Sequence, residues 1–271
     1  MAVLEIHDRL LDLSEAIRPL SGTVIELANA VSDASVEISQ IGRIVSQDPG
    51  LVAPLLREAN SAMSGASSEV TTVDGAIVRL GIARVLAVAT ASALDGVTPS
   101  DLPGYNLAGD TLWAHAKLAS QAAECIRRLS TVEMGPEVVT AALLHDIGKV
   151  ILGQVLIHRD LHQARVYYDD ITTAERELIS LDHAEVGSLL LEMWNLPLSI
   201  VEAVRYHHEP TDSEGPSAHA IHVADAVAWA IAEPEEHFMN PQLEASLEQL
   251  GLTFDQALVA VNRQLERESN S

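Results

Sequence analysis

Apolar residues recur at steps of three and four along most of this chain, and this spacing constrains the fold more than any other feature of the sequence. Ile38, Ile41 and Val45 show the pattern, as do Leu51 and Leu55 in the next segment. A period of 3.6 residues places such side chains on one face of a helix. Aromatic residues make up only 3% of the chain, and no convincing pair of strands is found. The sequence therefore predicts an all-α fold.

Residues that favour helix N-termini precede several of the apolar segments. Asp48-Pro49 combines an N-cap residue with a proline in the first helical turn. Pro197 is expected to begin another helix. In a capping box, side chains at the N-cap and at the third helical position bond each other's backbone N–H groups. Pairs with this spacing are Thr172 with Glu175, Asp182 with Glu185, and Thr253 with Gln256.

The clearest shift in composition lies between residues 96 and 104, where glycines and prolines prevent a helix from continuing. This segment predicts a boundary between two packed helical lobes, residues 1–104 and 105–271. No repeat or low-complexity tract stands out, and residues 266–271 are expected to form a polar tail.

Acidic residues outnumber basic ones by 39 to 16, which gives a formal net charge of −23. Such a charge repels nucleic-acid phosphates and anionic lipid headgroups. The sequence therefore argues against direct nucleic-acid binding and against a membrane partner. A basic protein partner is compatible with the charge, and so is the simpler role of keeping the protein soluble.

We expect a cytoplasmic protein. The longest clean apolar stretch, residues 85–94, is well short of the roughly 20 residues that cross a bilayer, and it predicts a buried helix. Charged residues between positions 5 and 9 interrupt the N-terminus where a signal peptide needs an apolar run. Cys125 is the only cysteine, so an internal disulfide is excluded, and its apolar neighbours predict a buried position.

Two aspartates occupy positions where an amphipathic helix would carry apolar residues. Asp146 lies on an apolar stripe that includes Val150, and Asp225 is flanked by Ile221 and Ala228 at spacings of four and three. A carboxylate buried in this way needs a partner, because unpaired charge is costly away from water.

Five histidines stand in similar settings, on or beside core-facing stripes. Each alone is more often a satisfied core residue or an exposed polar group than a ligand. Together with the two aspartates, they meet the condition that buried charge coordinates a cation or is fully paired. Imidazole and carboxylate together suit Fe, Mn or Zn better than Ca or Mg, so we predict a divalent transition-metal site. The proposed ligands are His115, His145, Asp146, His183, His207, His208 and Asp225. The histidines assigned as surface or core polar residues are His7, His158, His162, His219, His222 and His237.

The order of these residues resembles the metal-site sequence of the HD superfamily, and Leu144-His-Asp-Ile-Gly-Lys149 is similar to its central motif. The first half of the chain resembles one branch, the HDOD (HD-related output domain) family, and Leu112-Trp-Ala-His115 and Trp194-Asn-Leu-Pro197 extend the match over almost all of the chain. The segments of the first half that carry it are Arg18-Pro-Leu-Ser-Gly22, Ile44-Val-Ser-Gln-Asp-Pro-Gly-Leu51, Leu55-Leu-Arg-Glu-Ala-Asn-Ser61 and Ala76-Ile-Val-Arg-Leu-Gly81.

The resemblance implies two packed helical lobes and a bacterial signalling or regulatory role. In the related HD-GYP phosphodiesterases, a matching ligand set holds two metals that activate water for attack on a cyclic dinucleotide. Carried over, His115, His145 and Asp225 would hold one ion and His183, His207 and His208 the other, with Asp146 as the bridge and Lys149 facing the substrate phosphate. Two ions about 3.5–4 Å apart suit phosphodiester hydrolysis.

The chain departs from that pattern in two places. After His207-His208-Glu209-Pro210 it lacks the Gly-Tyr-Pro motif that accompanies dinucleotide hydrolysis, so specificity for cyclic di-GMP is not supported. Met63-Ser64 stand where the family usually has aromatic residues. The second half is also poor in Lys and Arg, so a phosphorylated substrate would be attracted mainly by the metals.

Three hypotheses follow from the sequence. In the first, the chain is a regulatory module that acts in trans on a signalling protein, and its metal site is structural or sensory. In the second, it is a metal-dependent phosphohydrolase or phosphodiesterase acting on a nucleotide or other phosphoester, with Asp146 and Lys149 as catalytic residues. In the third, the histidines and aspartates hydrogen-bond within a helical core without metal.

Overall fold

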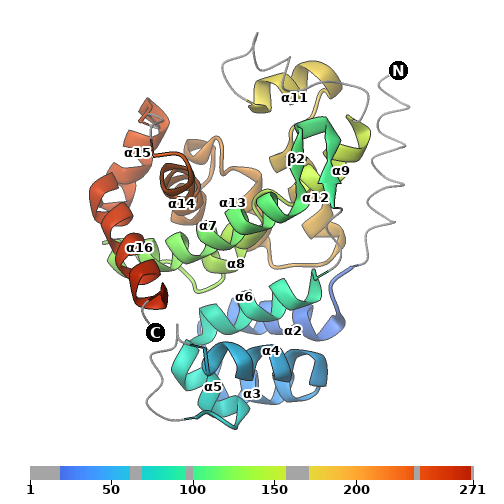
Figure 1. Cartoon of the computed structure of the whole chain (residues 1–271), viewed down its shortest axis with the longest axis vertical. Coiled ribbons are helices and arrows are strands. Elements are labelled where there is room, and N and C mark those ends of the chain that lie inside the picture. The colour runs from blue at the N-terminus through green and yellow to red at the C-terminus, as the bar shows by residue number, and fades with distance from the viewer. Residues whose placement is uncertain (1–18, 62–68, 96–99, 157–170, 235–238, 270–271) are drawn as a thin grey trace.

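The structure, a computed structural model of the chain, is built from helices, and the predicted all-α class is confirmed. It describes residues 19–61, 69–95, 100–156, 171–234 and 239–269. Figure 1 shows two packed groups of helices, with α2 to α6 below the remaining ones. The part of the chain described thus has the two helical lobes that the resemblance implied, while the boundary at residue 104 stays a prediction.

The N-terminal lobe consists of short helices whose apolar faces meet. Its elements are α2 (Gly22–Val31), α3 (Ile38–Ser46), α4 (Pro49–Ala59), α5 (Val73–Leu80) and α6 (Ile82–Ala93). Asp48 caps α4 as predicted, because its side chain accepts a hydrogen bond from the Gly50 amide at 2.9 Å. Helix α6 packs against α2, α4 and α5 within this lobe and against α8 of the other, so it joins the two cores.

The C-terminal lobe is arranged around α7 (Gly109–Leu129), which packs against α8 (Val138–Leu144), α14 (Pro216–Ala232) and α16 (Phe254–Ser269). A second layer pairs α12 (His183–Met193) with α9 (Gly148–Val155) and α13 (Leu198–Arg205). The remaining elements are α11 (Ile171–Ile179), the 3-10 turn η3 (Pro210–Asp212) and α15 (Pro241–Leu250).

A small hairpin that packs on α9 and α7 of the C-terminal lobe was not predicted from the sequence. Strands β1 (Asp101–Leu102) and β2 (Leu107–Ala108) pair antiparallel around the 3-10 turn η2 (Pro103–Tyr105). Asn106 closes the turn at φ 51°, a conformation that Asn adopts more readily than most residues. Strands of two residues are too short to show the period-2 alternation by which strands are recognised.

Two of the three predicted capping boxes are confirmed and one is wrong. Asp182 and Glu185 bond each other's backbone amides at the start of α12, and Thr253 and Gln256 do the same before α16. Thr172 lies inside α11 instead, and the Glu175 carboxylate bonds to groups far from the helix start. Thr172 and Glu175 have the spacing of a capping box, but in the folded protein the Glu175 carboxylate bonds to Tyr105 and His183.

Apolar helices fill the core. Val85, Leu86 and Leu94 of the longest apolar stretch are at most 1% exposed, as predicted. Cys125 is also buried, and its thiol donates to Gln264 Oε1 at 3.1 Å. Residues 138–155 are long and apolar enough to cross a membrane, but 89% of this segment is buried inside the protein, and core helices pass the same test.

Candidate metal centre

The structure brings all seven predicted ligands together from segments that are far apart in the chain. His115 comes from the middle of α7, His145 and Asp146 from the turn between α8 and α9, and Asp225 from α14. His183 is the first residue of α12, and His207 and His208 directly follow α13. Among the residues that the structure describes, two groups are spaced to hold a metal ion: first His115, His145 and Asp146, with Asp225 beside them, and second His183, His207 and His208.

In the first group, His115 Nε2 lies 2.8 Å and His145 Nε2 3.6 Å from Asp225 Oδ1. All three atoms are buried, and apart from these ion-pair contacts they make no hydrogen bond to the described residues. His145 Nδ1 faces the Ala142 carbonyl at 2.8 Å, so Nδ1 carries a proton and Nε2 is the atom that points into the centre. Buried acceptor atoms that crowd together in this way fit a shared cation.

The second group is made of imidazoles. His183 Nε2 and His208 Nε2 lie 2.8 Å apart, and the rings of His207 and His208 are separated by 4.1 Å between centroids. His207 Nδ1 donates to the Val204 carbonyl at 2.6 Å, which leaves its buried Nε2 unprotonated and without a partner in the described residues. Burial holds the pKa of both His207 and His208 well below the usual range, so both are neutral and available as ligands.

Asp146 lies between the two groups, where the resemblance placed a bridge. Its Oδ1 is 3.2 Å from His183 Nε2, and its Oδ2 is 3.5 Å from His145 Nε2. Burial would raise the pKa of this carboxyl, but the charges of His145 and Lys149 outweigh it and hold the pKa well below the ordinary value. Lys149 Nζ donates to Asp146 Oδ2 at 2.7 Å, so in this structure Lys149 balances the central carboxylate.

The sequence analysis missed two residues that orient a ligand. Glu175, which is fully buried, accepts from His183 Nδ1 at 2.8 Å and from the His183 amide at 2.8 Å. Tyr105 of the hairpin donates to the same carboxylate at 2.6 Å. A carboxylate behind a histidine fixes the tautomer and raises the basicity of the ligand nitrogen. Glu175 stands four residues from both Ile171 and Ile179, the same stripe anomaly that singled out Asp146 and Asp225.

The other described histidines fit their assignment as core polar residues. His219 Nδ1 pairs with Ser246 Oγ at 3.0 Å, and His222 Nδ1 donates to the His207 carbonyl at 2.7 Å. His222 therefore steadies the backbone of a ligand residue. The remaining four, His7, His158, His162 and His237, lie outside the described residues, as do Arg18 and Met63-Ser64.

Replacing Glu175 by glutamine should weaken metal binding about 10- to 100-fold, the usual cost of losing a partner that orients a ligand. The amide keeps the size of the side chain but removes the charge behind His183. Competition with a chelating dye measures the affinity, and Glu177→Gln, an exposed acid on the same helix, is the matched control. Equal affinities for the two variants would contradict an orienting role for Glu175.

Metal binding should also depend on pH through His183. Burial lowers the pKa of this imidazole, but Glu175 and Asp146 more than offset burial and raise it to about 9 in the metal-free protein. The resulting stabilisation is complete below the unfolded pKa near 6.5 and is lost as pH rises through about 9. A metal ion must displace this proton, so affinity should increase about tenfold per unit between pH 7 and 8.5. Chelator competition across this range measures the slope, and a flat profile would contradict the assignment.

Taken together, the donor set fits a metal on three observations. The ligand atoms are buried, several lack hydrogen-bond partners among the described residues, and backbone carbonyls or a carboxylate hold the second nitrogen of His145, His183 and His207. Buried nitrogen and carboxylate oxygen atoms that face one another in this way could hold a metal ion.

Known proteins that are similar to this chain were found by sequence and by structure. An uncharacterised protein of Treponema pallidum is 25% identical over 210 residues, which cover 75% of this chain and 39% of that protein. Among solved structures, a candidate phosphohydrolase of Shewanella amazonensis is similar with a TM-score of 0.69 and 23% identity, over 96% of this chain and 95% of that one. A candidate signal transduction protein of Marinobacter aquaeolei is similar with a TM-score of 0.72 and 21% identity, over 98% of this chain and 64% of that one.

These structural likenesses show a shared fold. The family itself is shown by sequence, since the HDOD domain matches residues 17–210, well over half of the chain. That range includes six of the seven proposed ligands and leaves out Asp225. With the order of the ligands, the helical architecture and this match in agreement, the chain belongs to the HDOD domain family.

Proposed function

We propose that this chain is a bacterial regulatory protein of signal transduction that acts through a protein partner and contains a two-ion transition-metal centre. His115, His145 and Asp225 would hold one ion and His183, His207 and His208 the other, with Asp146 between them. This ligand set suits Fe, Mn or Zn. The ions would join helices from both layers of the C-terminal lobe and so stabilise the folded state. A single buried cysteine fits a reducing cytoplasm.

The observation that carries the proposal is that the helices holding the second ligand group expose apolar side chains on their outer surface. Leu189 and Met193 of α12 are 44% and 46% exposed, and Leu198 at the start of α13 is 67% exposed. His183 begins α12, and His207 directly follows α13. Leu189 and Met193 lie one turn apart on α12, and adjoining apolar side chains that are exposed mark contact sites for other proteins. A change at the metal centre can therefore reach this surface through two helices.

Affinity capture from extracts of the encoding bacterium tests the proposal. Metal-loaded wild-type protein should retain a specific partner, and Met193→Glu and Leu198→Glu should lose it. Val259→Glu introduces the same charge at an exposed apolar residue of α16 and should retain the partner. Removal of metal should weaken capture as well. A partner captured equally by all variants would contradict the assigned surface.

A second candidate function is metal-dependent phosphoester hydrolysis, favoured by one feature of the centre. Its edge is accessible, because the side chain of Asp225 is 17% exposed and Trp229, stacked 4.7 Å from His115, is 38% exposed. The similar Shewanella protein is also named as a phosphohydrolase. A phosphoester panel assayed with the Mn- and Fe-loaded protein separates the two functions. Turnover that Asp146→Asn abolishes would favour the enzyme.

A further inference from the structure

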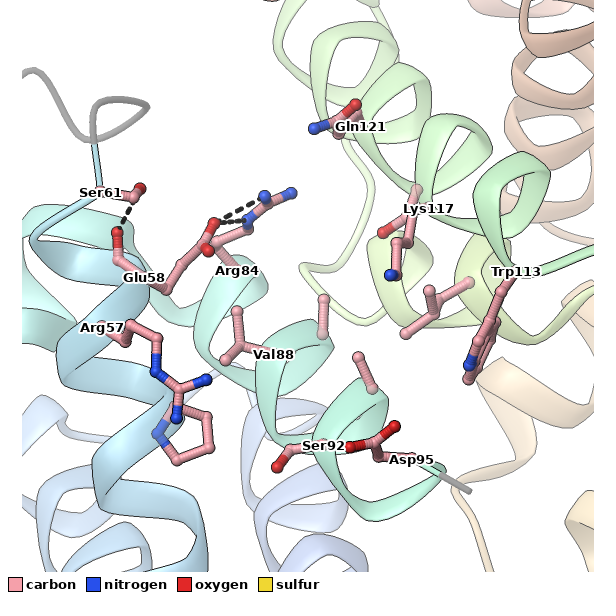
Figure 2. Close-up of a pocket in the computed structure, with 15 residues that line it drawn as sticks. Arg57, Glu58, Ser61, Arg84, Val88, Ser92, Asp95, Trp113, Lys117 and Gln121 are labelled. Carbon is pink, nitrogen blue, oxygen red and sulfur yellow. Dashed lines mark hydrogen bonds and ion pairs between the residues drawn. The ribbon is translucent and has the colours of Figure 1, made fainter. Parts of the chain in front are cut away.

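A cavity of about 630 Å³ lies between the two lobes, away from the metal centre. Helices α4 and α6 of the N-terminal lobe form one wall, and α7 and α8 form the other. Figure 2 shows Arg57, Glu58 and Arg84 on the first wall, with Lys117 and Trp113 facing them from α7. Its volume is within the range of about 300–1,000 Å³ that is typical of small-molecule sites.

The charge of this cavity is opposite to that of the protein. Three basic side chains, Arg57, Arg84 and Lys117, line it together with two acidic ones, Glu58 and Asp95. The lining is thus positive by one formal charge, whereas the whole chain is negative by 23. Only 16 basic residues are present in the sequence, so three in one cavity is a marked local concentration. A cleft of this sign favours an anion.

The three basic side chains differ in whether they form an ion pair. Arg84 pairs with Glu58 at 2.7 Å, which holds its guanidinium across the wall and cancels that acid. Arg57 and Lys117 are exposed, and neither has an ion-pair partner in the part of the chain that the structure describes. These two cations, one from each lobe, are therefore available for a ligand.

Trp113 adds a flat apolar surface to the charged cavity. It is half-buried on α7, one helical turn before Lys117. An indole ring stacks on planar aromatic groups and is indifferent to their exact identity. Inorganic phosphate would fill little of 630 Å³ and would leave this surface uncovered. The combination selects a ligand that carries both an anionic group and a planar ring.

We propose that this inter-lobe cavity binds a nucleotide, with its phosphate on Arg57 and Lys117 and its base on Trp113. A ligand seated there contacts both lobes. It also contacts two of the helices that position the first metal group, since Lys117 follows His115 by two residues on α7 and Leu143 of the cavity wall precedes His145 by two. The nucleotide would thereby stabilise one arrangement of the lobes.

Calorimetric titration of the full chain with AMP, GMP, CMP, adenosine and inorganic phosphate tests the proposal. We expect at least one nucleotide to bind with one site per chain, and phosphate and nucleoside alone to bind at least about tenfold more weakly. Lys117→Gln, Arg57→Gln and Trp113→Leu should each reduce nucleotide affinity about tenfold or more, the effect of losing one charged or stacking contact. Arg263→Gln, an exposed arginine of α16, should leave it unchanged.

A nucleotide could instead bind at the metal centre, and one further titration distinguishes that site from the inter-lobe cavity. Protein stripped of metal should bind the nucleotide as well as the loaded protein does, because no metal ligand lines the cavity. Quenching of tryptophan fluorescence should disappear in Trp113→Leu. Absence of binding by every nucleotide, equal affinity of the three cavity variants and wild type, or loss of binding on removal of metal would each overturn the proposal.

Discussion

Asp146→Ala should release the bound metal and lower stability by about 3–5 kcal/mol, the cost of removing one partner from a buried ion pair. The variant leaves the Lys149 ammonium, whose side chain is 13% exposed, without the carboxylate 2.7 Å away. It also removes the group between the two ligand sets. At about 2–4 °C per kcal/mol for a chain of this size, the melting temperature should fall by roughly 6–20 °C. Thermal melts and elemental analysis of untagged protein measure the two effects.

Two variants separate the metal effect from the loss of the ion pair. Asp146→Asn keeps the shape of the side chain but removes its charge, so metal loss should accompany a smaller change in the melting temperature of the metal-free protein. Asp110→Ala, an exposed acid in the first turn of α7, should cost less than about 1 kcal/mol. Retention of wild-type metal content by Asp146→Ala would refute the central position of this residue.

Gly148→Ala should destabilise the protein by about 3 kcal/mol or more, because the added methyl group has no space. A Cβ at this position would lie 2.0 Å from the His183 carbonyl oxygen and 2.7 Å from the Gly187 amide. Both are backbone atoms of α12, so α9 and α12 would have to move apart. That movement would displace His183 from Asp146, and metal affinity should fall together with stability.

Chemical denaturation of three variants tests the close approach of these helices. Gly187→Ala introduces a Cβ 3.2 Å from the Gly148 amide, and it should be milder because the contact is less severe. Gly22→Ala, where nothing lies within 4 Å, should match or slightly exceed the wild type in stability. Equal stability of Gly148→Ala and Gly22→Ala would mean that the helices are packed less closely than described.

Glu175 illustrates why part of the metal centre was not predicted from the sequence. Its spacing from Thr172 matched a local capping rule, and local rules cannot register a partner eight residues away on another helix. Ile171 and Ile179, four residues to either side of Glu175, were the better indication that it is buried and paired, because a buried acid on a core-facing stripe needs a partner. The hairpin around Tyr105 carried no comparable signal, since two-residue strands show no periodicity.

The sequence by itself determined the helical class, the starts of α4, α12, α13 and α16, and the identity of the seven candidate ligands, because helix periodicity, capping residues and buried charge are properties of neighbouring residues. Only the tertiary structure decided that Lys149 balances Asp146 and that Glu175 and Tyr105 stand behind His183. The inter-lobe cavity was likewise found only in the tertiary structure. Its residues come from four helices, and their separation depends on packing between lobes, which the spacing of residues along one helix does not encode.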